Sequence, residues 1–100
     1  MTNFWKETIT KLANSGKTFA DVRYIQNSKY QITKENFERI AKYTNYDSGY
    51  GIEYISPDLT LVGDDWWLER QEYDGAEWWE YKEKPARIPK YREITTSDEL

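Results

Sequence analysis

The sequence predicts an α+β domain in which two or three N-terminal helices pack on a three-stranded antiparallel β-meander. Two observations lead to this fold class. Apolar side chains recur at helical spacing within residues 1–45, whereas residues 66–82 form two aromatic arms around Asp-Gly, the pair most typical of a tight β-turn. The 100 residues make one domain, with a helical part at 1–45, a sheet at 52–83 and a proline-containing basic extension at 84–100.

Two of the expected helices have clear start signals. Thr2 or Asn3 can cap the first helix, which carries apolar residues at helical spacing until Gly16 ends it. Thr33 caps a second amphipathic segment at 34–44, whose acidic side chains near the start favour the positive end of the helix. Both segments are expected to lie against the sheet.

A further helix is expected between these two. Thr18 and Asp21 resemble a capping box, with the shorter acid in place of glutamate, and Phe19, Val22 and Ile25 then mark one helical face. The β-branched residues of the same stretch also suit a strand.

A tyrosine-rich stretch at 43–51 ends the helical part. Its glycines, asparagine and serine break regular structure and display several rings, including that of Tyr50. Tyrosine with Ser, Gly and Asn is the composition that antibody loops use for recognition. The alternative is that these rings cover the seam between helices and sheet.

The sheet is expected to contain strands at 59–62, 66–73 and 76–82. A two-residue turn at Asp74-Gly75 sets Glu69 opposite Glu80 and Glu72 opposite Glu77, which costs up to about 1 kcal/mol for each like-charge pair. A three-residue turn with a Gly75 bulge removes both clashes. The two-residue turn is favoured because it is the more frequent one.

In either register, adjacent tryptophans point to opposite faces of the hairpin. One face must pack on the helices, so about two of the four indole rings are expected on the other face, unless the C-terminal extension or a long loop covers it. The extension is expected to be either an extended edge against the sheet or a loose tail. The candidate partner-binding residues are Trp66, Trp67, Trp78, Trp79 and Tyr50, with a charged rim of Glu69, Glu72, Asp74 and Glu77.

The chain has no cysteine and no histidine, which excludes disulfides, Cys/His zinc sites and His-dependent catalysis. Only carboxylates, Lys, Arg, Tyr and Ser/Thr remain for chemistry, and we expect no catalytic residue, no metal and no cofactor. The residue types of a Mg²⁺-dependent nuclease do occur, as Asp58 followed by Glu80 and Lys82, but such short patterns arise often by chance in so charged a chain. Glycosidase chemistry lacks a cleft in a domain of this size, and a winged helix would meet DNA with its most acidic part.

The net charge of −4 is unevenly distributed. Residues 1–57 sum to +2 and 84–100 to +1, whereas 58–83 carry nine acidic and two basic side chains and sum to −7. Such a field repels nucleic acid and favours a partner with a basic surface. No apolar run approaches the roughly 20 residues of a membrane span, and no signal peptide is evident, so we expect a cytoplasmic protein without membrane contact.

The stretch 61–82, LVGDDWWLERQEYDGAEWWEYK, together with the upstream Asn45-Tyr46 and Gly49-Tyr50-Gly51, resembles a group of small, mostly uncharacterised proteins of phages and prophages from Gram-positive bacteria. The resemblance implies a phage origin and the cytoplasm of a bacterial host, and it brings no catalytic residue. By analogy with anti-CRISPR and anti-restriction inhibitors, we expect a non-enzymatic protein that binds a host or phage protein. The alternative is an accessory or structural phage protein that self-associates as a homo-oligomer.

Overall fold

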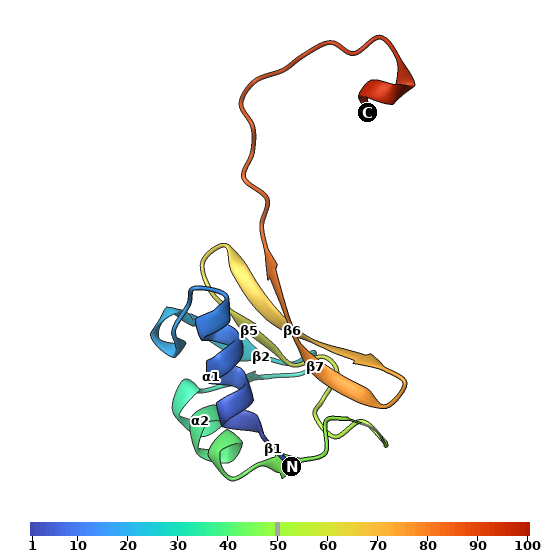
Figure 1. Ribbon diagram of the computed structural model, residues 1–100. Helices are drawn as coiled ribbons and strands as arrows, with labels where there is room; N and C mark the ends of the chain where they lie inside the picture. The colour runs from blue at the N-terminus through green and yellow to red at the C-terminus, as the bar shows by residue number, and fades with distance from the viewer. Residues whose placement is uncertain (50) are drawn as a thin grey trace.

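Two helices lie on one face of a five-stranded antiparallel sheet in the computed structural model, which describes residues 1–49 and 51–100 (Figure 1). The strand order is β3-β2-β5-β6-β7, and a separate pair, β1-β4, joins the two chain segments that flank the helices. The elements are β1 (Thr2–Asn3), α1 (Phe4–Asn14), β2 (Tyr24–Gln26), β3 (Gln31–Ile32), α2 (Lys34–Lys42), β4 (Asn45–Tyr46), β5 (Thr60–Val62), β6 (Trp66–Tyr73) and β7 (Ala76–Glu83), with 3₁₀ turns at Phe19–Asp21 and Ser97–Glu99.

The prediction of a three-stranded meander under two or three helices is wrong. The capping box of Thr18 and Asp21 forms, but it opens a single 3₁₀ turn, after which the chain extends. Ile25 of β2 then pairs with Leu61 of β5 on one side and with Ile32 of β3 on the other. The β-branched residues of this stretch therefore add two strands to the sheet, because pairing with β5 buries Ile25 completely.

The predictions for the first and last helix are confirmed in their start signals. Asn3 caps α1 by accepting a hydrogen bond from the Lys6 N–H, and Thr33 caps α2 through the Asn36 N–H. Gly16, with φ +74°, follows α1 and takes the left-handed conformation that ends helices. The second of these helices is slightly shorter than expected, since it ends at Lys42.

The hairpin of β6 and β7 adopts the two-residue turn. Asp74 has φ 50° and Gly75 has φ 86°, the pair of positive angles that a type I′ turn requires. Leu68 consequently pairs with Tyr81, and both like-charge pairs, Glu69 with Glu80 and Glu72 with Glu77, are present in the ladder.

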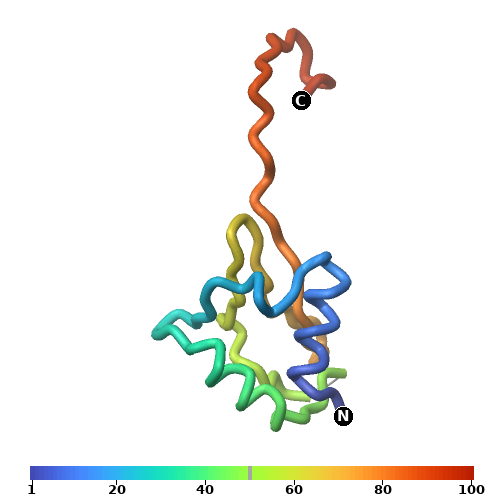
Figure 2. Tube along the Cα trace, turned by 90° about the vertical axis from the view of Figure 1, so that its left-hand side faces the viewer, coloured from blue at the N-terminus to red at the C-terminus, as the bar shows by residue number. Residues whose placement is uncertain are grey.

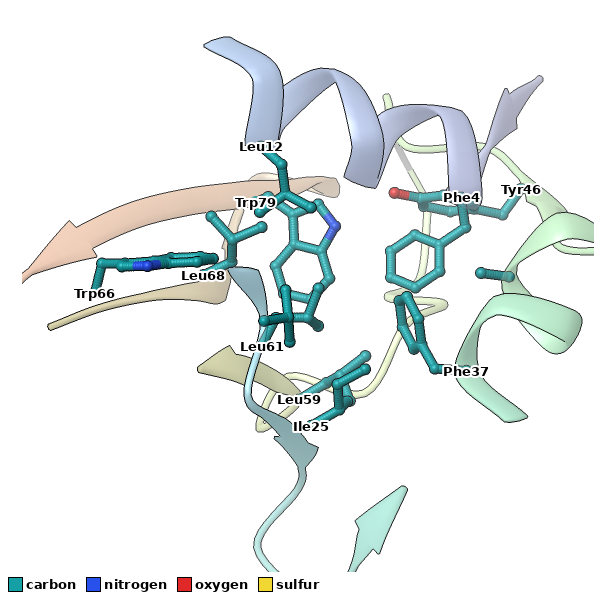
Figure 3. Packing of buried hydrophobic residues seen from close by; sticks show 12 residues of the cluster. Phe4, Leu12, Ile25, Phe37, Tyr46, Leu59, Leu61, Trp66, Leu68 and Trp79 are labelled. Carbon is teal, nitrogen blue, oxygen red and sulfur yellow. The ribbon is translucent and has the colours of Figure 1, made fainter. Parts of the chain in front are cut away.

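An aromatic cluster joins the helices to the sheet (Figure 3). Phe4 of α1 stacks on Trp79 of β7 with centroids 5.5 Å apart, and its ring meets Phe37 of α2 and Tyr46 of β4 edge-on. Such pairs add roughly 0.5–1.5 kcal/mol to the burial of their apolar area. Because Phe4 contacts residues of α2, β4 and β7, it fixes how α1 sits on the sheet.

The C-terminal extension neither covers a sheet face nor forms an edge strand. Residues 84–100 are exposed throughout and run away from the body of the domain, so that the molecule measures 56 × 31 × 28 Å (Figures 1 and 2). Of the two expectations for this segment, the structure has the tail.

Gly63 begins the turn between β5 and β6, and the structure leaves no room for a side chain at this position. A Cβ at this position would overlap the indole of Trp66, which is 5% exposed and has little freedom to move aside. We expect Gly63→Ala to lower the free energy of unfolding by about 1–3 kcal/mol in urea titrations. The matched control is Gly49→Ala, where the nearest atom, Oδ1 of Asp47, lies at 3.4 Å; equal stability of the two variants would contradict this packing.

Candidate functional site

The hairpin β6–β7 has two faces with different chemistry. Trp66, Leu68 and Trp79 turn towards the helices and are buried, while the residues between them turn away from the helices. We call this second side the open face. It consists of Tyr24, Gln26, Thr60, Val62, Trp67, Glu69, Gln71, Trp78, Glu80 and Lys82, which are linked across the strands by direct pairing.

A buried arginine organises the helix-facing side. The side chain of Arg70 is 3% exposed, and its Nη1 lies 3.2 Å from Oε1 of Glu7 on α1. Its Nη2 donates to Oε1 of Glu77 at 3.1 Å and to the hydroxyl oxygen of Tyr46 at 3.0 Å. The guanidinium carbon also lies 5.2 Å from the ring centroid of Phe4 and 4.8 Å from that of Trp79.

The two carboxylates of this cluster hold further elements in place. Glu77, whose side chain is 2% exposed, accepts hydrogen bonds from the backbone N–H groups of Tyr54 at 2.7 Å and Ile55 at 3.0 Å. Glu7 accepts from the Tyr46 hydroxyl at 2.7 Å. Burial, and then the hydrogen bond to Glu7, raises the pKa of Tyr46 well above its ordinary value, so this phenol stays protonated as a donor.

The open face carries indole rings tied to carboxylates. Trp67 Nε1 donates to Oε1 of Glu69 at 2.7 Å, and Gln71 Nε2 donates to Oε2 of the same residue at 2.8 Å. Trp78 Nε1 donates to Oε2 of Glu80 at 3.3 Å. Glu69 and Glu80 face each other across the ladder, so two negative charges lie between the two rings.

The structure divides the predicted site residues between these surroundings. Trp67, Trp78 and Glu69 lie on the open face, with Trp78 39% exposed and Trp67 half-buried. The other predicted site residues that the structure describes lie elsewhere. Trp66, Trp79 and Glu77 are buried on the helix side, and Glu72 and Asp74 are exposed at the hairpin tip. Tyr50 lies outside the described residues.

Sequence reasoning placed Glu80 opposite Glu69 but did not count it among the site residues, and it gave Arg70 no role in the site. The signal for Arg70 was present, since it shares the inward phase of β6 with Trp66 and Leu68. A charged residue in that phase needs a buried partner of opposite charge. Its partner on α1, Glu7, is 63 residues away and has no such signal.

The described residues do not assemble an evident metal site. No group of three or more Asp or Glu side chains among residues 1–49 and 51–100 is placed to hold a metal ion. Asp58, a residue of the nuclease-like pattern, instead accepts hydrogen bonds from the hydroxyls of Ser28 and Ser56 and from the Ser28 N–H at 3.0 Å. It thereby connects the β2–β3 turn to the segment before β5.

Comparison with protein-family models, with curated proteins and with solved structures finds no match to this chain. The resemblance of the hairpin to phage proteins therefore stays a prediction. In the part of the chain that the structure describes, no helix has the length and apolar character needed to cross a bilayer.

We expect Glu77→Gln to lower the free energy of unfolding by about 3 kcal/mol or more, because an amide NH₂ would then face Arg70 or a backbone N–H, donor against donor. Urea unfolding measures the loss. The matched control is Glu72→Gln, which changes the exposed cross-strand neighbour of Glu77 and should alter stability by less than about 0.5 kcal/mol. Similar losses of stability in both variants would contradict the importance of the buried carboxylate of Glu77 for the folded state.

Asp58 makes the stability of the folded state depend on pH, and the direction of this dependence follows from its hydrogen bonds. Hydrogen bonds from the Ser28 and Ser56 side chains hold its pKa well below the ordinary value, so the folded state favours the carboxylate. The resulting stabilisation is complete above the ordinary Asp pKa of about 4 and is lost as the pH falls below it. The Tm difference between wild type and Asp58→Asn should therefore shrink on acidification from pH 7. A difference that grows instead would contradict the lowered pKa of Asp58 in the folded state.

Proposed function

We propose that this protein is a non-enzymatic binding protein that holds a basic partner protein against its open face. The observation that carries the proposal is the position of Trp67 and Trp78 on a sheet face that neither helix nor the C-terminal tail covers. Tryptophan in an exposed patch with a polar surround is typical of the anchors of protein interfaces.

The hydrogen bonds on the open face favour recognition. Each indole N–H is already directed at a carboxylate, Glu69 for Trp67 and Glu80 for Trp78, so both rings are held in one orientation. A partner therefore meets rings that have little rotamer freedom left to lose, which lowers the entropic cost of binding. β6 and β7 supply a rigid base for them.

The charge of the open face favours a partner with cationic side chains. Glu69 and Glu80 lie opposite each other, and Lys82 Nζ lies 3.9 Å from Oε1 of Glu80. The open face itself therefore carries two acids and one lysine, and residues 58–83, which also include the helix side and the loops, sum to −7. Arginine and lysine of a partner can bind the carboxylate lone pairs that Trp67, Gln71, Trp78 and Lys82 leave unused, and they can approach the ring faces as cations. Enzymes that act on nucleic acid present such surfaces, so an inhibitor of a host defence or nucleic-acid enzyme is the specific form of this proposal.

The test is capture of proteins from a bacterial lysate by the full chain and by surface variants. We expect capture to fall at least tenfold with Trp78→Ser and with Glu69→Gln/Glu80→Gln, and to weaken with salt and with added double-stranded DNA. The DNA competes because the proposed partner uses the same basic surface for nucleic acid.

Matched controls lie elsewhere on the surface. Tyr43→Ser removes a ring that is 85% exposed at the C-terminal end of α2, and Glu53→Gln removes an exposed acid. Both variants should capture as wild type does. Capture that is indifferent to Trp78, or no captured protein at all, would contradict the proposal.

A further inference from the structure

The C-terminal tail, residues 84–100, is a long exposed segment with little attachment to the domain. The Lys84 N–H donates to the Asp65 carbonyl at 2.7 Å. Beyond this point, the hydrogen bonds and the ion pair recorded for the described tail residues, such as Arg92 with Glu99, stay within the tail itself. The tail is therefore available to another surface.

Apolar residues follow a three-residue period along the tail. Pro85, Ile88, Tyr91 and Ile94 are spaced by three, and the side chains of Ile88 and Tyr91 are 78% and 86% exposed. A polyproline II chain has three residues per turn, so in that conformation these four side chains form one stripe. Pro85 and Pro89 favour this conformation by fixing φ.

Cationic side chains flank the stripe. Residues 84–92 contain four Lys or Arg and no acidic residue, whereas residues 58–83 contain nine Asp or Glu and two Lys or Arg. Polyproline II segments are typically recognised by surfaces lined with aromatic rings. The open face offers both complements, since Trp67 and Trp78 enclose the carboxylates of Glu69 and Glu80.

The tail is poorly placed to reach the open face of its own chain. It continues outward from β7, and the bond of Lys84 to Asp65 together with the fixed φ of Pro85 directs it away from the sheet (Figures 1 and 2). A second copy has no such constraint. Exchange of tails between two copies is self-complementary and gives a closed dimer with two equal contacts.

We propose that two copies of this chain associate by exchanging tails, so that the apolar stripe of each tail lies on the open face of the other copy. The inference rests on the proposed function, because both assign binding to the open face. It adds that self-association regulates the binding of the partner. A tail bound there competes with the basic partner, so self-association determines how much of the open face is free.

The experiment measures the mass of the full chain by sedimentation over a range of concentrations. Wild type should shift from the 12.1 kDa chain to twice that mass. Arg87→Glu/Lys90→Glu reverses the charge of the tail, and Glu69→Lys/Glu80→Lys reverses the charge of the open face. In each variant alone the tail and the face have charges of the same sign, so each should remain at the mass of one chain. An equimolar mixture of these two variants should restore the dimer, because the altered tail then meets the altered face and the unaltered tail meets the unaltered face, each pair with opposite charges.

The control is Lys6→Glu/Lys29→Glu, which makes the same change of net charge at exposed lysines of the body and should dimerise as wild type does. A wild type that stays at one chain mass, a tail-reversed variant that still dimerises, or a mixture that fails to do so would overturn the tail exchange. Tail binding within one chain appears as the first of these results.

Failure of this inference is distinguishable from failure of the proposed function. If the masses do not change but lysate capture still depends on Trp78, only the tail exchange falls. If the charge-swapped mixture dimerises but capture is indifferent to Trp78, the proposed partner binding falls. Where both hold, the tail-reversed variant should capture more partner than wild type at equal concentration.

Discussion

The arrangement of this domain depends on one buried guanidinium. Arg70 connects α1 through Glu7, β4 through Tyr46 and β7 through Glu77, and Glu77 in turn holds the backbone of residues 54–55. Removing a charged pair from water costs several kcal/mol of free energy, and even well-placed hydrogen bonds and ion pairs do little more than offset this cost. In addition, Nε of Arg70 has no hydrogen-bond partner among the described residues. We therefore interpret the cluster as a determinant of which arrangement forms, more than as a source of net stability.

The same cluster explains why the hairpin accepts two like-charge pairs. A shift of one residue would turn Arg70 towards water and carry Glu69 to the helix side, so the register is fixed by what each face can solvate. In the observed register Glu77 is neutralised by Arg70, and Glu69 is bonded to Trp67 and Gln71. The repulsion expected between facing acids is thus reduced by groups that lie beside them.

Local signals predicted the elements that local interactions form. The caps at Asn3 and Thr33 and the Asp74-Gly75 turn act within a few residues, and α1, α2 and the hairpin follow from them. For β2 the local signals left helix and strand both open, because it has three residues and becomes a strand only by pairing with β5, far along the chain. The division of the tryptophans between two faces followed from strand alternation, whereas the burial of Glu77 depends on Arg70 and on backbone groups that no sequence pattern indicated.

The two faces of the hairpin are linked by this constraint. Because Arg70 and Glu77 hold β6 and β7 from the helix side, the strands between them form a rigid base, and the side chains of opposite phase have fixed positions on the open face. Trp78 can therefore remain 39% exposed without needing contacts of its own to the core. A surface of this kind loses little freedom when it is covered, so a buried ion pair that adds little net stability can still prepare the opposite face for binding.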